Sequence, residues 1–264
     1  MTTLIQVAEN TAIDLLDGLA FFDDRTANPM VMQEACRGYA TIGACYLLQR
    51  RDQPTFRTWL ALGAQAYADW LSLAPAPRHT HAHAEPFLYA VVAGDASLAS
   101  LIHQRLRPDF NQGCEYEEDF AFARILHLLA CATDPLPEVK RLLAFWRGVS
   151  GGGEPEFALA EALAARATDT VRDLIGDRLD HHADERRQAQ RNGSGNPDER
   201  LALGRLDLEV AALVTIARHR LEMDLVIEHR LLPQELLPAA WSTTATVPAS
   251  AWRDEERYHV YRDQ

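Results

Sequence analysis

Apolar residues recur at helical spacing through the middle of the chain, in two amphipathic runs separated by Thr133-Asp134-Pro135. This tripeptide can supply an N-cap and a proline at the first helical position, so it predicts a helix boundary. The apolar face of the first run consists of Phe120, Ala123, Ile125, Leu126, Leu128 and Leu129, and that of the second of Val139, Leu142, Leu143 and Trp146. The pattern predicts an antiparallel helical hairpin over residues 115–146 rather than strands.

Two further segments follow the same plan, in which an alanine, one variable residue and an aspartate join two apolar helices. The junctions are Ala93-Gly94-Asp95, Ala132-Thr133-Asp134 and Ala167-Thr168-Asp169, at spacings of 39 and 35 residues. The spacing is repeat-like but lacks the signature residues of tetratricopeptide or ankyrin arrays. We therefore predict an all-α fold, a compact stack of antiparallel helical hairpins with degenerate pseudo-repeats.

The flanking sequence predicts further helices and one linker. Asn28-Pro29 reads as an N-cap followed by a proline at the first helical position. Residues 75–85, PAPRHTHAHAE, have no apolar period and form the clearest linker. We predict one helical domain over residues 1–240, within which 1–74 and 86–240 could form two layers. Residues 241–264 are predicted to be an irregular C-terminal tail, anchored by Trp241 or Trp252 if at all.

The net charge and the composition indicate which classes of partner the chain could bind and in which cellular compartment it would lie. The net charge of the chain is −12, and Lys140 is the only lysine among 26 basic residues. This acidic balance disfavours nucleic acid and anionic membranes as partners and favours a basic protein, although solubility alone would also explain it. The sequence shows no usual secretory signal, no run of eighteen apolar residues and no CxxC pair, so we predict a cytoplasmic protein.

Acidic residues are concentrated at two places. The first group, Glu115, Glu117, Glu118 and Asp119, precedes the first helix of the central hairpin, and the second is Asp23-Asp24. Carboxylates near a helix N-terminus are favoured by the macrodipole by roughly 0.3–1 kcal/mol each, which gives the first group a purely structural explanation. The alternative is that both groups belong to a partner-binding surface.

Candidate catalytic and metal-binding patterns are weak. Gly148-Val149-Ser150-Gly151-Gly152 has the GxSxG spacing of a nucleophile elbow, but it follows a predicted helix in a chain without an evident parallel sheet, so it reads as a connector. His79, His81, His83 and Glu85 alternate in the linker and could offer metal ligands if the segment were extended, although exposed histidines are the simpler interpretation. We predict no catalytic residue and no cofactor.

The segment RLDLEVAALVTIARHRLEMDLVIEHRLLPQELL, Arg205 to Leu237, resembles the closing part of the immunity protein 49 family. FFDD and the YATIGACYLLQRR and FRTWLALGAQAYADWLSLA helices resemble its opening, so that the likeness covers about residues 10–240. Leu221 departs from the family, because it occupies a turn where glycine is expected. The resemblance implies an all-helical protein encoded beside a polymorphic toxin in bacteria, with no catalytic residue to transfer.

These observations lead to one principal hypothesis and two rivals. The principal hypothesis is a cytoplasmic immunity protein that binds a cognate toxin and neutralises it, with Glu115, Glu117, Glu118 and Asp119 as the charged contact surface and Asp23 and Asp24 as a second patch. Complementary charge would then raise the association rate. The first rival is a helical-repeat scaffold that binds a cellular protein or peptide in a groove. The second is a metal-dependent helical enzyme that uses His79, His81 and His83.

Overall fold

The computed structural model describes residues 3–23, 28–194 and 196–258, together with the secondary structure but not the side chains of Phe21 and Asp23. Within these ranges the chain forms helices and three isolated β-bridges, with no strand, so the predicted all-α class is confirmed. None of the helices described is both long and apolar enough to cross a membrane.

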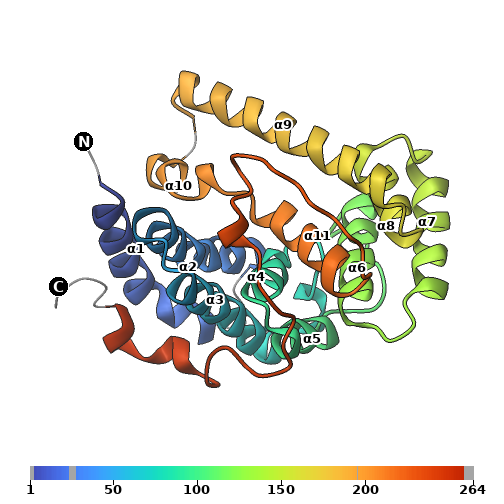
Figure 1. Cartoon of the computed structure of the whole chain (residues 1–264). Coiled ribbons are helices and arrows are strands. Elements are labelled where there is room, and N and C mark those ends of the chain that lie inside the picture. The colour runs from blue at the N-terminus through green and yellow to red at the C-terminus, as the bar shows by residue number, and fades with distance from the viewer. Residues whose placement is uncertain (1–2, 24–27, 195, 259–264) are drawn as a thin grey trace.

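The helices follow one another through short connections (Figure 1). The α-helices are α1 (Leu4–Gly18), α2 (Pro29–Arg50), α3 (Gln53–Leu73), α4 (Glu85–Ala93), α5 (Ala96–Arg105), α6 (Glu117–Cys131), α7 (Leu136–Ser150), α8 (Pro155–Ala164), α9 (Thr168–Asn192), α10 (Pro197–Leu201) and α11 (Leu208–His219). The short 3-10 helices are η1 (Leu19–Asp23), η2 (Ala76–Arg78), η3 (Leu203–Arg205), η4 (Gln234–Leu236), η5 (Ala251–Arg253) and η6 (Glu255–Tyr258).

The N-terminal half is built on the hairpin of α2 and α3, with α1 against α2 and α4 against α3. Asn28 caps α2 as predicted, since its side-chain oxygen accepts a hydrogen bond from the backbone N–H of Met30 at 2.9 Å. The two helices of the hairpin approach closely at Gly63, where an added Cβ would lie 2.9 Å from the Cβ of Tyr39. A larger residue at position 63 would therefore force the helices apart.

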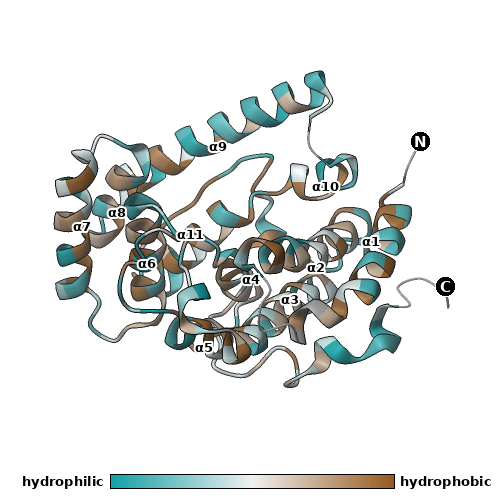
Figure 2. Ribbon diagram, turned by 180° about the vertical axis from the view of Figure 1, so that it is seen from behind, coloured by the Kyte–Doolittle hydropathy of each residue, from teal (hydrophilic) through white to brown (hydrophobic). Residues whose placement is uncertain are grey.

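In the C-terminal half, α6 pairs with α7 and α8 with α9, and α11 packs beneath them against α4 and α6. The apolar face predicted for α7 is confirmed, because Val139, Leu142 and Trp146 are buried and Leu143 is partly buried against the core. Val210 and Ile216 of α11 are also buried. Helix α9 crosses one side of the molecule and its C-terminal half extends away from α8 toward α10 (Figure 1). Coloured by hydropathy, α9 is hydrophilic over most of its length (Figure 2).

The three predicted hairpin junctions differ in detail. Asp95 caps α5, accepting a hydrogen bond from the backbone N–H of Leu98 at 2.9 Å. The predicted cap at Asp134 is wrong, because α7 begins at Leu136 after Pro135 and has no side-chain cap. At the third junction α9 already begins at Thr168, so Asp169 lies in its first turn. The repeat relation among the hairpins therefore stays a prediction.

The described part of the segment beyond residue 240 contacts the core near Ser242 and at Trp252. Ser242 forms a parallel bridge with Asp95, and the Ala240 carbonyl lies so near Gly94 that an added Cβ would meet it at 2.8 Å. Because Gly94 also has a φ of +78°, only glycine suits this turn. Of the two tryptophans considered as anchors, Trp252 is fully buried and donates its indole N–H to Asp69 at 2.8 Å.

Candidate functional site: an acid-rimmed cavity

A cavity of about 320 Å³ lies between α2, α4, α6 and α11 and the loop that precedes α4. Its lining combines apolar side chains of α4 and α6 with polar groups from every contributing element. Two carboxylates, Glu85 and Glu209, line it. Four more lie near its lining residues, and we call it the acid-rimmed cavity; these are Glu34, Asp119, Glu156 and Glu199.

Glu85, the first residue of α4, forms the polar wall of the cavity. One carboxylate oxygen accepts hydrogen bonds from Gln33 at 2.7 Å and from Nε of Arg37 at 3.0 Å, and the other accepts from the hydroxyl of Tyr89 at 2.9 Å. Arg37 also pairs with Glu34 at 2.7 Å. Although burial disfavours the charged guanidinium, the two glutamates give Arg37 a net raised pKa.

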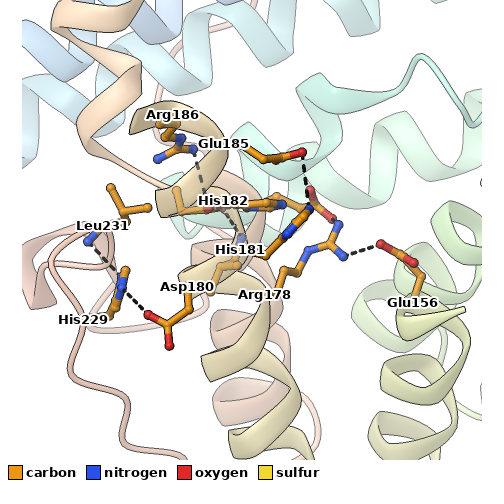
Figure 3. A network of polar contacts seen from close by, with 12 residues as sticks. Glu156, Arg178, Asp180, His181, His182, Glu185, Arg186, His229 and Leu231 are labelled. Carbon is orange, nitrogen blue, oxygen red and sulfur yellow. Dashed lines mark hydrogen bonds and ion pairs between the residues drawn. The ribbon is translucent and has the colours of Figure 1, made fainter. Parts of the chain in front are cut away.

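Arg178 of α9 joins a second pair of carboxylates beside the cavity (Figure 3). It lies 2.6 Å from Glu156 of α8 and 2.7 Å from Glu209 of α11, and only 15% of its side chain is exposed. Burial opposes charge on all three groups. For Glu156 burial is the largest single influence and raises the pKa, but the hydrogen bond from Arg178, a backbone hydrogen bond and the nearby positive charges together lower it, whereas for Glu209 burial prevails and the pKa is raised. Glu209 thus carries a charge that the fold stabilises incompletely.

Asp119 lies on α6 one turn before the residues of this helix that line the cavity. In a helix, residues three, four and seven positions apart share a face, so Asp119 continues the row of Phe122, Ala123 and Leu126 that lines the cavity. Its side chain is exposed and forms no ion pair with a described residue. Partial burial and the neighbouring Glu118 raise the pKa of Asp119.

Glu199 of α10 lines a neighbouring hollow against α1 and α2, and it lies close enough to Arg37 and Glu85 to interact electrostatically with the polar wall of the cavity. Burial raises its pKa, and although Arg37 lowers it, Glu34 and Glu85 raise it further. No described basic side chain forms an ion pair with Glu199. Glu199 and Asp119 thus have raised pKa values and no ion-pair partner among the described residues, so an added positive charge nearby would stabilise their charged forms.

Neutral histidines form the inner end of the cavity. His81 and His127 are each 2% exposed, with ring centroids 4.9 Å apart, and Phe87 stacks on His127 at 3.7 Å. Burial lowers the pKa of His81 to about 3 and that of His103, on the far side of His127, to about 4. Burial likewise lowers the pKa of His127 well below its usual value. All three rings are thus neutral at neutral pH.

Two of these buried rings present unused nitrogens. Nε2 of His81 lies 2.7 Å from the carbonyl oxygen of Arg107, so in the neutral ring Nε2 carries the proton and Nδ1 is an acceptor. Neither Nδ1 of His81 nor Nδ1 of His127 has a hydrogen-bond partner among the residues described. Both histidines line the cavity, but their Nδ1 atoms are themselves buried.

The acidic residues predicted to contact a partner lie in different structural environments. Glu115 turns inward, where its carboxylate accepts hydrogen bonds from the backbone N–H groups of His81 at 2.8 Å, Ala82 at 3.2 Å and Asn111 at 3.1 Å. It therefore holds the histidine loop in place. Glu117, Glu118 and Asp119 form the first turn of α6, where the macrodipole favours them. Asp24 and the side chain of Asp23 lie outside the described part of the chain.

The linker histidines do not converge on a metal site. His79 bonds the carbonyl of Ala74 at 3.0 Å, His81 bonds that of Arg107, and His83 faces the amide oxygen of Gln33 at 3.3 Å. The described residues contain no group of three or more His, Cys, Asp or Glu side chains placed to hold a metal ion. The prediction that these histidines are solvent-exposed is wrong for His81, because Glu115 fastens the loop against the core.

The GxSxG segment lies at the end of α7, with Gly151 as the left-handed C-cap. It is therefore not the strand-to-helix turn of a nucleophile elbow. Sequence reasoning missed Arg37, Arg178, Glu199 and Glu209 as parts of a common site, since they come from four different helices. The sequence did contain one signal for this site, because Glu209 is the single charged residue in the apolar run 208–217 of α11.

Chemically, the cavity is suited to a positively charged hydrogen-bond donor. Two carboxylates line it and four more lie nearby, against the guanidinium groups of Arg37, Arg124 and Arg178, and the neutral rings of His81 and His127 also line it. An arginine or lysine side chain has this chemistry. Searches of protein-family models, of curated proteins and of solved structures found no match to the chain.

Proposed function

We propose that this chain is an immunity protein that binds a cognate bacterial toxin in the cytoplasm of the producing cell and neutralises it. We further propose that the toxin inserts a basic side chain into the acid-rimmed cavity, beside the first turn of α6. The observation that carries the proposal is the surplus of negative charge around a concave site, together with the resemblance of residues 10–240 to the immunity protein 49 family. Neutralisation would follow from occlusion of the toxin.

In this proposal the exposed carboxylates at the rim and the partly buried carboxylates inside the cavity have different roles in binding. Exposed carboxylates such as Asp119 steer a basic partner and raise its association rate. Partly buried carboxylates such as Glu209 hold the inserted cation in a region of lower dielectric, where each contact is stronger and dissociation slower. Protection demands tight binding, and a nanomolar complex corresponds to about −12 kcal/mol.

A growth experiment tests the function. The gene adjacent to the one that encodes this chain would be expressed in a susceptible bacterium, with and without this protein. We expect the neighbouring product to arrest growth and the protein to restore it, and the two purified proteins to form a complex. Absence of a complex, or arrest that persists at full expression of the protein, would contradict the proposal. Binding to a cellular protein instead would favour the helical scaffold.

Charge reversal locates the contact surface. The double variant Asp119→Lys with Glu199→Lys should lose protection and weaken the complex at least a hundredfold, because two attractive charges become repulsive. The matched control is Asp173→Lys with Asp177→Lys, which changes the net charge equally at exposed positions of α9. Equal loss in both variants would mean that only net charge matters, and the cavity assignment would be wrong.

A further inference from the structure

A second polar cavity, of about 500 Å³, lies between the C-terminal half of α9, α10, η3 and the turn at Arg230-Leu231. Five arginines line it and none of its described lining residues is acidic, although the chain as a whole has a net charge of −12. We call it the arginine cavity. The arginines are Arg186, Arg187, Arg200, Arg205 and Arg230.

Nearby carboxylates neutralise only part of this charge. Asp207 lies 3.5 Å from Arg186 but also pairs with His182 at 2.7 Å, and Asp184 pairs with Arg187. No carboxylate of the described residues forms an ion pair with Arg205 or Arg230. Like charges around one hollow repel each other, so an anion placed among them would relieve the repulsion.

The arginine cavity also has hydrogen-bond donors to offer. The guanidinium groups of its five lining arginines carry N–H donors. Guanidinium groups match the geometry of phosphate oxygens and can donate two parallel hydrogen bonds to one phosphate. The positive charge and the guanidinium geometry therefore point to the same class of ligand.

The size of the space favours an extended anion over a single phosphate. A volume of about 500 Å³ falls in the range of pockets for small organic ligands, about 300–1,000 Å³. The arginines come from two helices, a 3-10 helix and a turn, so positive charge surrounds the space rather than marking one spot. Leu201, Leu231 and Ala183 supply an apolar surface on which a ring could pack.

We propose that the arginine cavity binds a small polyphosphate anion, such as a nucleoside polyphosphate. This site lies apart from the acid-rimmed cavity and does not depend on the identity of a protein partner. Its ligand would add negative charge between α9 and α10 and would stabilise the packing of α10, a helix of five residues, against the C-terminal half of α9.

The test is calorimetric titration of the full chain with ATP, tripolyphosphate, AMP and sulfate, in separate experiments at low salt. We expect ATP and tripolyphosphate to bind with one-to-one stoichiometry, at least tenfold more tightly than AMP or sulfate. Tighter binding of ATP than of tripolyphosphate would identify a nucleotide, and equal binding would identify the polyphosphate chain alone as the ligand. Absence of binding by both would overturn the proposal.

Two variants show whether binding occurs in the arginine cavity. Arg205→Gln with Arg230→Gln should weaken tripolyphosphate binding at least tenfold, because it removes two of the five positive charges. The control, Arg141→Gln with Arg172→Gln, removes two charges that already pair with Glu138 and Asp169 on exposed helical faces and should leave affinity unchanged. Equal weakening in both variants would overturn the assignment. Tighter binding of a single-stranded oligonucleotide or an acidic peptide than of ATP would also overturn the proposal.

Discussion

The acid-rimmed cavity and the arginine cavity lie near successive parts of α9 and carry surplus charges of opposite sign. Arg178, beside the first, is held between two carboxylates, whereas Arg186 and Arg187, about 12 Å farther along the helix axis, belong to a group in which arginines outnumber carboxylates. In the first cavity the surplus charge is negative, and in the second it is positive. The comparison teaches that paired charges maintain the fold, whereas the unpaired surplus marks the surface available to a ligand.

Asp207 lies between the two regions, and its substitution is expected to have the largest effect on stability. It caps α11 by accepting a hydrogen bond from the backbone N–H of Val210 at 3.1 Å, and it also pairs with His182 and Arg186. Asp207→Ala removes the cap and leaves two buried or half-buried cations without their carboxylate. We expect the free energy of unfolding, measured by urea denaturation, to fall by about 3–5 kcal/mol.

The control for this experiment is Asp207→Asn, which keeps an acceptor for the cap but loses the negative charge. We expect it to fall between the wild type and Asp207→Ala. A loss below about 1 kcal/mol in the alanine variant would show that the two regions are not joined through this carboxylate.

The neutral histidines beneath the acid-rimmed cavity predict acid sensitivity. A histidine whose folded pKa is depressed contributes stability that is lost as pH falls below its unfolded value of about 6.5, because only the unfolded chain takes up the proton. For His81, whose folded pKa is about 3, the loss is about 1.4 kcal/mol per pH unit through most of that window. His182 acts oppositely, because its hydrogen bond to Asp207 raises its pKa and favours folding at low pH.

The variant His127→Leu isolates the histidine contribution. It removes one ring that must stay neutral, so its stability should fall less steeply than that of the wild type between pH 6.5 and 4.5, by up to about 1.4 kcal/mol per pH unit. Urea unfolding at several pH values measures both slopes. Parallel pH dependence in the two proteins would show that His127 is protonated in the fold, contrary to our description of the inner wall.

A smaller effect is expected for partner affinity when one carboxylate is neutralised. Glu199→Gln removes a negative charge beside Arg37 without reversing it, and we expect binding of the toxin to weaken about tenfold, equivalent to about 1.4 kcal/mol. Surface plasmon resonance should show part of the loss as slower association. Asp173→Gln on α9 is the matched control, and an equal change there would remove the distinction between cavity and general surface.

The smallest effect concerns Glu117, in the first turn of α6. If the macrodipole alone explains its presence, Glu117→Gln should lower the free energy of unfolding by about 0.3–1 kcal/mol and leave toxin affinity unchanged. A loss of affinity without a loss of stability would extend the contact surface beyond the cavity and revive the broader acidic patch predicted from the sequence.

The helices could be predicted from sequence because their apolar periods are local, and Asn28 acts as the predicted cap while Asp95 lies at a predicted junction. The polar site could not be predicted in the same way. The sequence suggested that Glu115 is an exposed charge. In the structure its carboxylate accepts hydrogen bonds from His81 and Ala82, more than thirty residues earlier in the chain, and from Asn111, just before α6. Arg178 and Glu209 meet only after α9 and α11 pack, which no local pattern shows.

The central claim is that a basic side chain of a toxin enters the acid-rimmed cavity, and a double-mutant cycle tests it most directly. Glu199→Gln would be combined with alanine variants of the toxin's arginines and lysines, and the binding free energies of all combinations measured. We predict that at least one toxin residue couples to Glu199 by more than about 1.5 kcal/mol. Coupling near zero for every basic residue of the toxin would contradict the account.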